Sequence, residues 1–165
     1  MMDNKPFQAN IDTAIHRIKS EQNKDIVSKV RSGEVDKTKL PCVVFAGVIE
    51  SNKRKDDNVV QHSGYFVLDF DKIDPKIKKQ QLSTDSYIYS AWVSPSGNGV
   101  KALVKCPPNI ENHSLYYNAM LSRYPELDPT GKNISRLCFE SYDPDLYINE
   151  GSLTWDKTLT DEQLD

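Results

Sequence analysis

Residues 64–106 read GYFVLDFDKIDPKIKKQQLSTDSYIYSAWVSPSGNGVKALVKC, and this stretch decides the fold. Its apolar runs are rich in aromatic and β-branched residues, which is typical of strands. Asp74-Pro75 predicts the start of a short helix, with Asp74 as the N-cap and the proline in the first turn. The expected elements are a strand at 64–70, a helix from 74, a strand at 87–93, a turn at 94–99 and a strand at 100–106.

Two further elements extend this pattern toward the C-terminus. Residues 111–123 are expected to form a helix that turns Leu115 and Ala119 inward, and residues 134–140 a fourth strand. The order β-α-β-β-α-β is the split β-α-β arrangement, which predicts an α+β fold with an RRM-like or ferredoxin-like antiparallel sheet. Both helices would cover one face of this four-stranded sheet. The other face is either open or covered by the N-terminal segment.

The N-terminal part adds helical and strand-like segments. Apolar residues at helical spacing predict helices over residues 8–32, with a stop at Gly33, and residues 42–49 are strand-like. We expect one domain over residues 1–165. Its parts would be an N-terminal helical extension at 1–40, an α+β core at 41–150 and a C-terminal tail or linker at 151–165.

Composition narrows the class of protein. The chain has 165 residues, a net charge of -3 and a pI of about 5.6. This argues against a basic coat protein that binds nucleic acid non-specifically, but not against an enzyme that acts on nucleic acid. No apolar run reaches the roughly 18 residues of a membrane span and no signal peptide opens the chain, so we expect a cytoplasmic protein. The three cysteines lack the spacing of zinc ligands.

Asp69 and Asp71 follow an apolar run and carry the strongest functional signal. Strand side chains alternate, so both carboxylates project from one face while Phe70 packs on the other. Two like charges repel unless a cation lies between them, and a hard divalent cation is the usual partner of such carboxylates. Alternatively, the strand end runs into a polar turn in which Asp71 and Asp74 cap the next helix.

The sequence SPSGNGVK (residues 94–101) predicts a glycine-containing turn that ends in a lysine. Its glycines can present backbone N–H groups as a nest for phosphate. The same sequence also suits a plain hairpin connection with an exposed Lys101. In a split β-α-β sheet the first and third strands are neighbours. We therefore expect Asp69, Asp71 and this turn to meet at one edge of the sheet.

Asp128, Arg136 and the aromatic residues of the strands are further candidates. Asp128 follows the second predicted helix and is either a site residue or part of an ordinary Asp-Pro turn. Arg136 starts the fourth predicted strand, from which its side chain could reach the sheet face. His62 and His113 lack partners at ligand spacing. Strand aromatics can stack with bases or fill the core, which applies to Tyr65, Tyr87, Tyr89 and Trp92.

Three blocks, in order along the chain, resemble the motifs of the archaeo-eukaryotic primase superfamily, which includes the primase-polymerases. These blocks are Leu68-Asp69-Phe70-Asp71, Ser96-Gly97-Asn98-Gly99-Val100-Lys101 and Leu127-Asp128. The sequence is most similar to one branch, the VirE N-terminal-like domains of bacterial mobile elements, over residues 40–149. The similarity to that branch includes His62-Ser63-Gly64, Ser135-Arg136 and Ser141-Tyr142-Asp143-Pro144-Asp145.

The resemblance implies an RRM-like nucleotidyltransferase of DNA replication that uses Mg²⁺ or Mn²⁺. The implied metal-binding and catalytic residues are Asp69, Asp71 and Asp128. The implied contacts to a nucleoside triphosphate come from Ser96, Gly97, Gly99, Lys101 and Arg136. A single-stranded DNA template and a helicase-like ATPase would be its partners. Primases usually carry histidine where this chain has Lys101, so the alternative is a degenerate module that binds nucleic acid or a helicase partner without synthesis.

Overall fold

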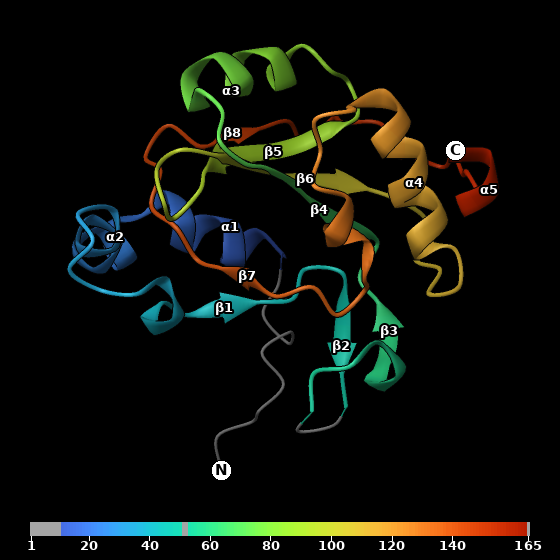
Figure 1. Cartoon of the computed structure of the whole chain (residues 1–165), viewed down its shortest axis with the longest axis horizontal. Coiled ribbons are helices and arrows are strands. Elements are labelled where there is room, and N and C mark those ends of the chain that lie inside the picture. The colour runs from blue at the N-terminus through green and yellow to red at the C-terminus, as the bar shows by residue number, and fades with distance from the viewer. Residues whose placement is uncertain (1–10, 51–52, 165) are drawn as a thin grey trace.

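The computed structural model describes residues 11–50 and 53–164, which form a mixed α+β fold (Figure 1). At its centre is an antiparallel sheet in the order β4-β6-β5-β8. Its strands are β4 (Tyr65–Phe70), β5 (Ile88–Val93), β6 (Val100–Lys105) and β8 (Tyr147–Ile148). The helices are α1 (Ile11–Lys19), α2 (Lys24–Arg31), α3 (Pro75–Ser83), α4 (His113–Arg123) and α5 (Asp161–Leu164). None of the helices in the described part of the chain is long and apolar enough to cross a membrane.

Short strand pairs lie outside the central sheet. β1 (Cys42–Val43) pairs with β7 (Cys138–Phe139), and β2 (Gly47–Ile49) pairs with β3 (Val59–His62). Single turns of 3₁₀ helix connect several elements: η1 (Glu21–Asn23), η2 (Lys37–Lys39), η3 (Asp56–Asn58) and η4 (Pro129–Lys132). η2 contributes Lys37 to the lining of the pocket described below, and η4 begins directly after Asp128, which also lines it.

The segment over residues 64–106 folds as its pattern predicts. Asp74 caps α3 by accepting a hydrogen bond of 3.0 Å from the backbone N–H of Lys76. β6 lies between β4 and β5 and is antiparallel to both. In the β4–β6 register Asp69 lies opposite Lys101. The predicted adjacency of the first and third strands is therefore confirmed.

The predicted fourth strand does not join this sheet. Of residues 134–140 only Cys138–Phe139 forms a strand, and it pairs with β1. Just before it, Ser135 donates hydrogen bonds from its backbone N–H (3.0 Å) and its hydroxyl (2.6 Å) to Oδ1 of Asp56, which ties this stretch to η3. The sheet is extended instead by β8, which pairs with the outer edge of β5. The predicted position of the fourth strand was wrong.

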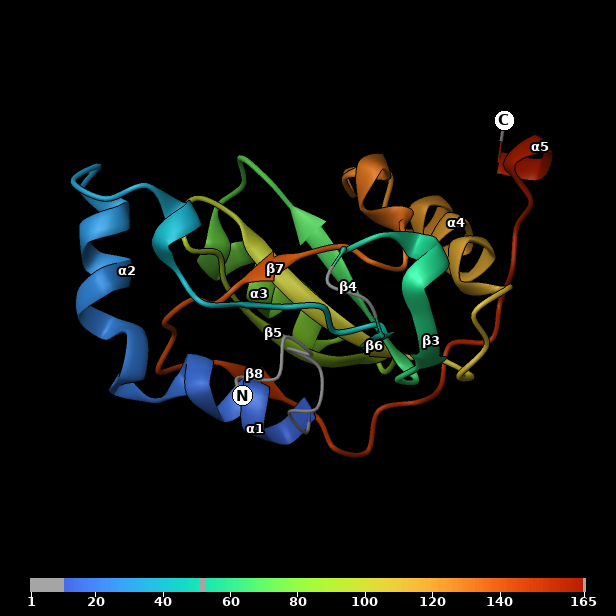
Figure 2. The ribbon, with the colours of Figure 1, turned by 90° about the horizontal axis from the view of Figure 1, so that it is seen from below.

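Apolar side chains fill both faces of the sheet. One core lies between the sheet and helices α3 and α4, and includes Leu68. The second core lies on the opposite face and includes Ile15 of α1. Figure 1 shows α3 and α1 on opposite sides of the sheet, and Figure 2 shows β1 and β7 crossing the face that α1 also covers. The N-terminal segment therefore covers this face, and it buries Tyr89 and Trp92 in the second core rather than leaving them open for stacking.

The predicted N-terminal helical region is divided in two. The 3₁₀ turn η1 separates α1 from α2, and the Ser20 hydroxyl caps it by accepting a hydrogen bond from the backbone N–H of Gln22 (3.4 Å). α2 ends at Arg31, and Gly33 follows with a φ of +83°, which confirms the predicted stop. Residues 8–10 of the predicted region lie outside the described residues.

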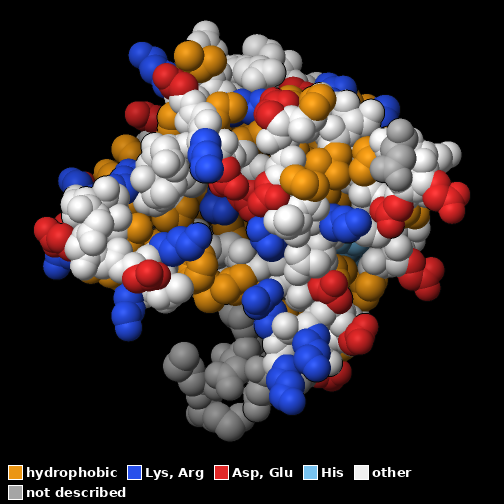
Figure 3. All heavy atoms as spheres, in the orientation of Figure 1, with side chains coloured by type: hydrophobic (Ala, Val, Ile, Leu, Met, Phe, Trp, Pro, Cys, Tyr) orange, Lys and Arg blue, Asp and Glu red, His pale blue; other side chains and the backbone are white. Residues whose placement is uncertain are grey.

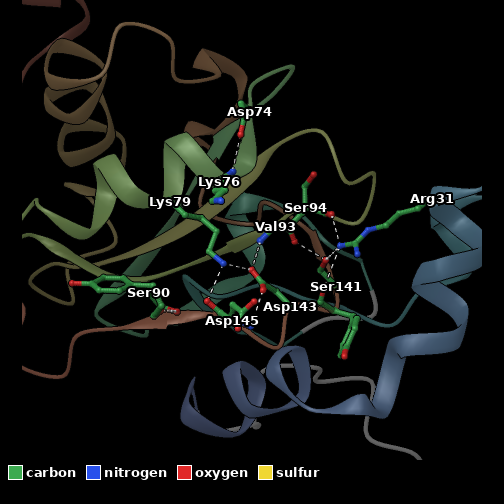
Figure 4. A network of polar contacts seen from close by, with 12 residues as sticks. Arg31, Asp74, Lys76, Lys79, Ser90, Val93, Ser94, Ser141, Asp143 and Asp145 are labelled. Atoms are coloured by element: carbon green, nitrogen blue, oxygen red, sulfur yellow. Dashed lines mark hydrogen bonds and ion pairs between the residues drawn. The ribbon is translucent and has the colours of Figure 1, made fainter.

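A buried carboxylate, that of Asp143, links several elements at the end of β5 (Figure 4). It accepts hydrogen bonds from Nζ of Lys79 in α3 (2.6 Å) and from the backbone N–H of Val93 in β5 (2.9 Å). Beside it, Nη2 of Arg31 in α2 donates to the backbone oxygen of Ser94 (3.1 Å). These bonds fix α2 and α3 to the end of β5, where the turn over residues 94–99 begins.

The C-terminal segment packs onto the same body. Trp155 is buried in the first core, and its indole Nε1–H donates to the backbone oxygen of Tyr116 in α4 (3.1 Å). Thr154 forms an isolated parallel bridge with Lys105 of β6. Part of the segment that was expected as a tail or linker therefore contributes to the core.

Candidate functional site

A pocket of about 380 Å³ opens where β4 ends and β6 begins. Acidic, basic and apolar side chains line it: Asp69, Asp71, Asp128, Lys37, Arg54, Lys101, Arg136, Leu137 and Phe139. Figure 3 shows acidic and basic side chains close together around a hollow near the middle of the face in view. The three candidate aspartates and two of the candidate phosphate-binding residues, Lys101 and Arg136, therefore share one pocket.

Asp69 and Lys101 form an ion pair at the base of this pocket. They are register partners on β4 and β6, and Nζ of Lys101 lies 2.5 Å from Oδ1 of Asp69. Asp69 is 7% exposed. Burial lowers the pKa of Lys101, but the neighbouring Cys138, Asp69 and Asp71 outweigh this effect, so the pKa lies above that of a free lysine. The pocket therefore contains a fixed positive charge at physiological pH.

Asp71 follows the last residue of β4 and is exposed. The turn after β5 packs closely on this strand end: a Cβ at Gly99 would lie 2.6 Å from the backbone oxygen of Phe70 and 3.5 Å from Cα of Asp71. The backbone N–H of Ile73 also donates to the backbone oxygen of Asn98 in the turn (3.0 Å). Glycine at position 99 lets the two segments approach, and their contact holds Asp71 at the pocket.

Asp128 reaches the pocket from the other side of β4. Its backbone N–H donates to the backbone oxygen of Asp69 (3.0 Å), and its Oδ1 caps η4 by accepting from the backbone N–H (2.9 Å) and hydroxyl (2.7 Å) of Thr130. Arg136 Nη2 lies 3.6 Å from its Oδ2. Burial raises the pKa of Asp128, but the bonds from Thr130 and the charges of Arg136 and Lys101 lower it by more. Asp128 is thus a cap as well as an acidic group of the pocket.

The remaining residues of the predicted turn lie outside the pocket lining. The Ser96 hydroxyl donates to Oδ1 of Asn98 (2.6 Å) and lies 3.0 Å from the Ser94 hydroxyl. Gly97 has a φ of +85°, and its backbone N–H closes the turn on the backbone oxygen of Ser94 (3.0 Å). The turn therefore supports the strand end, whereas the charged lining comes from β4, β6 and the segments around them.

Sequence reasoning did not assign Lys37, Arg54, Leu137 and Phe139 to the site. Arg54 belongs to a basic cluster that is usually a solvated loop, and here its Nη1 donates to the backbone oxygen of Ser135 (2.9 Å). Lys37 begins η2, which is capped by the preceding aspartate. Both cations come from the N-terminal part of the chain, whose path over the sheet is not visible in local sequence patterns.

His62 and His113, which have no ligand-like sequence spacing, lie against each other, and neither lines the pocket described above. Nε2 of His62 and Nδ1 of His113 are 3.0 Å apart, and Nδ1 of His62 accepts a hydrogen bond from the backbone N–H of Gly64 (2.9 Å). That acceptor role places the proton of neutral His62 on Nε2, so His62 donates to His113. Burial lowers the pKa of both rings, and that of His113 falls to about 4. The pair is therefore neutral and structural at physiological pH.

The carboxylates of the pocket suit a hard divalent ion but form no closed protein cage. In residues 11–50 and 53–164, no group of three or more His, Cys, Asp or Glu side chains is placed to hold a metal ion. Mg²⁺ that binds with a nucleotide uses one or two carboxylates and completes its shell with phosphate oxygens and water. Asp69 and Asp71 supply two such carboxylates. Carboxylate ligands suit Mn²⁺ as well as Mg²⁺. The donor set therefore fits an ion that arrives with a phosphate ligand.

Comparison with known proteins gives one family. Residues 35–148 match the family described as BT4734-like, N-terminal domain. The matched range contains every residue that lines the pocket, from Lys37 to Phe139. No curated protein and no solved structure has a significant match to the chain.

Proposed function

The chain belongs to the BT4734-like N-terminal domain family, and we propose that it is a primase-polymerase-like nucleotidyltransferase domain. The observation that carries the proposal is the shared pocket, in which Asp69, Asp71 and Asp128 face the cations of Lys101 and Arg136. Carboxylates for a divalent ion beside cations for phosphate are the two requirements of a site for a metal-bound nucleoside triphosphate. The resemblance of the same residues to primase-polymerase motifs supports this chemistry.

The charges of the lining favour a polyanion. Four cationic side chains and three carboxylates line the pocket, so the lining carries a net charge of +1 when all are ionised. Asp69 and Lys101 neutralise each other, and Arg136 lies near Asp128. A divalent ion on Asp69 and Asp71 would raise the positive charge further. The pocket then offers a triphosphate several cations on one side.

Each residue would have a separate role. Asp69 and Asp71 would hold Mg²⁺ or Mn²⁺, which when bound activates a 3′-hydroxyl and neutralises charge on the triphosphate. Lys101 would release Asp69 and donate hydrogen bonds to phosphate oxygens, as a compact point charge. Arg136 would bind phosphate through its planar guanidinium. Arg54, which comes from the N-terminal part of the chain, would bind phosphate in the same way. Asp128 would hold its own segment against β4 through the hydrogen bond from its backbone N–H to the backbone oxygen of Asp69.

The wider setting is part of the same proposal. We propose that the β4-α3-β5-β6-α4 part is the RRM-like unit of a VirE N-terminal-like domain from a mobile element, in which β8 rather than the predicted fourth strand extends the sheet. The expected partners are a single-stranded DNA template and a helicase-like ATPase. We propose that both bind around the pocket mouth, where Lys37, Arg54 and Asp71 are exposed.

One observation favours a second candidate, a degenerate module that binds nucleic acid or a helicase partner without synthesis. Lys101 stands where primases usually carry histidine, and it already neutralises Asp69 through the 2.5 Å ion pair. A carboxylate that keeps this partner is a poor metal ligand. The second candidate therefore needs no metal, and its binding to nucleic acid would depend on the cations of the pocket.

A nucleotide-incorporation assay separates the two candidates. Labelled nucleoside triphosphates, a single-stranded DNA template and Mn²⁺ are incubated with the wild type and with a D69N/D71N double variant. The first candidate predicts extended product from the wild type alone. The second predicts no product, together with salt-dependent binding to single-stranded DNA that survives in the double variant. Absence of both product and DNA binding would contradict the first candidate and the nucleic-acid-binding form of the second.

A further inference from the structure

One wall of the pocket is apolar although the rest is charged. Leu137 and Phe139 line it, and Cys138 between them is buried in the second core. Leu137 precedes β7 and also packs against that core. Phe139 is partly buried, yet it packs into neither apolar core. Among the described residues, this large aromatic ring lies at the edge of a polar pocket and outside both apolar cores.

The backbone keeps this ring in place. Phe139 belongs to β7, where it pairs with Cys42 of β1. The next residue, Glu140, is buried and accepts hydrogen bonds from Nε of Arg17 (2.7 Å) and Nδ2 of Asn23 (3.0 Å). Strand pairing on one side and this buried carboxylate on the other fix the backbone at Phe139 relative to the charged lining. A flat apolar surface that is already ordered is the property of a stacking platform.

We propose that Phe139 is the platform on which the base of the bound nucleotide stacks. The proposal rests on the proposed function, because it takes the ligand of the pocket to be a nucleotide. Lys101 and Arg136, together with the metal ion that Asp69 and Asp71 would hold, receive the phosphates, and the Leu137–Phe139 wall receives the base. The pocket is thus divided into a phosphate side and a base side.

The position of Lys37 agrees with an accessible ring face. Its Nζ lies 6.0 Å from the centroid of the Phe139 ring, which is the outer limit of a cation–π contact. Lys37 is exposed, and its long flexible side chain does not seal the ring. When a base covers Phe139, the ammonium group of Lys37 remains within the pocket and can pair with phosphate.

The chemistry of the lining also sets the selectivity of this site. Among the described residues that line the pocket, none has an amide or hydroxyl side chain, and the charged side chains that could read a base edge are those assigned above to the phosphates, the metal ion and the cap of η4. Stacking on an aromatic ring is tolerant of base identity, since every base has a π-face. The substrate class is therefore nucleoside triphosphates with little preference among bases. The small differences in affinity would follow the stacking strength of each base.

Calorimetric titration of variants at position 139 tests the platform. ATP and inorganic tripolyphosphate, each with Mn²⁺, are titrated into the wild type, F139L and F139W. The F139L variant keeps an apolar side chain against the fold but removes the π-face, and F139W restores an aromatic surface. Stacking predicts that F139L weakens ATP binding by about 5- to 100-fold while tripolyphosphate binding changes less than about twofold. F139W should bind ATP as the wild type does, and melting temperatures show that each variant is folded.

Three outcomes would overturn the platform. If wild type and F139L bind ATP equally, the ring is not the base platform, although metal-dependent nucleotide binding stands. If F139L weakens ATP and tripolyphosphate by the same factor, Phe139 acts through the shape of the phosphate side. If F139L loses binding to a single-stranded oligonucleotide but keeps ATP binding, the ring serves a strand and not a free nucleotide. A wild type that binds neither ATP nor tripolyphosphate would overturn the proposed function itself.

Discussion

Replacement of Lys101 by Met is the most informative change to the pocket. It removes the ammonium group and keeps a side chain of similar length, so Asp69 is left buried without its charged partner. Breaking one side of a buried ion pair costs about 3–5 kcal/mol. The Lys101 and Asp69 side chains are 16% and 10% exposed, so we take the lower end, about 3 kcal/mol. For a chain of this size the melting temperature should fall by roughly 6–12 °C.

The same variant separates the two roles of Lys101. Because Asp69 no longer has to release an ammonium group, Mn²⁺ alone should stabilise K101M more than the wild type. ATP with Mn²⁺ should bind K101M more weakly than the wild type, because one phosphate contact is lost. Differential scanning fluorimetry and calorimetry measure the two effects.

Two controls accompany these measurements. K29M, at an exposed lysine of α2 outside the pocket, should melt like the wild type, and D69N/K101M should recover most of the lost stability. If K101M melts within 2 °C of the wild type, a margin of about 1 kcal/mol or less, the ion pair does not stabilise the fold as proposed. If Mn²⁺ stabilises both proteins equally, Lys101 does not compete with the metal ion for Asp69.

Two other predictions concern stability. Burial lowers the pKa of His113 to about 4, against about 6.5 in an unfolded chain. Between these two values the unfolded chain binds a proton that folded His113 does not. The free energy of unfolding should therefore fall by up to about 3 kcal/mol as the pH drops from 6.5 to 4. H113N, whose side-chain oxygen still accepts from His62, should flatten this slope in urea melts, and an unchanged slope would contradict the assignment. G99A should cost about 1–3 kcal/mol in chemical denaturation, because its Cβ would lie 2.6 Å from the Phe70 backbone oxygen. G151A, where a Cβ makes only an ordinary contact, is the matched control, and equal stability of the two variants would show that the turn is not tightly packed on β4.

The part of the fold that the sequence predicts is the part governed by local patterns. Asp74 caps α3, and the strands on either side of the turn over residues 94–99 pair as expected. The position of the fourth strand depended instead on contacts distant in sequence. Hydrogen bonds between Ser135 and Asp56 hold the chain before β7, and no local pattern records them.

The candidate site shows the same division. Element order placed Asp69 beside Lys101, because the first and third strands of a split β-α-β sheet are neighbours. Arg54 and Phe139 reach the pocket only because β1 pairs with β7 and the N-terminal segment crosses the sheet. Such pairings between short segments cannot be read from hydrophobic periodicity, since two-residue strands carry too little pattern.

Calorimetric titration of ATP with and without Mn²⁺ tests the central claim most directly. The proteins are the wild type, D71N and the control D156N, which changes an exposed aspartate outside the pocket. Because Asp71 is exposed, its replacement should leave the fold intact, as melting temperatures will show. A metal-dependent nucleotide site predicts that the wild type and D156N bind ATP with Mn²⁺, and that binding is at least about tenfold weaker without Mn²⁺ or in D71N, a loss of about 1.4 kcal/mol. Equal ATP binding with and without Mn²⁺, or equal binding by D71N and the wild type, would contradict it.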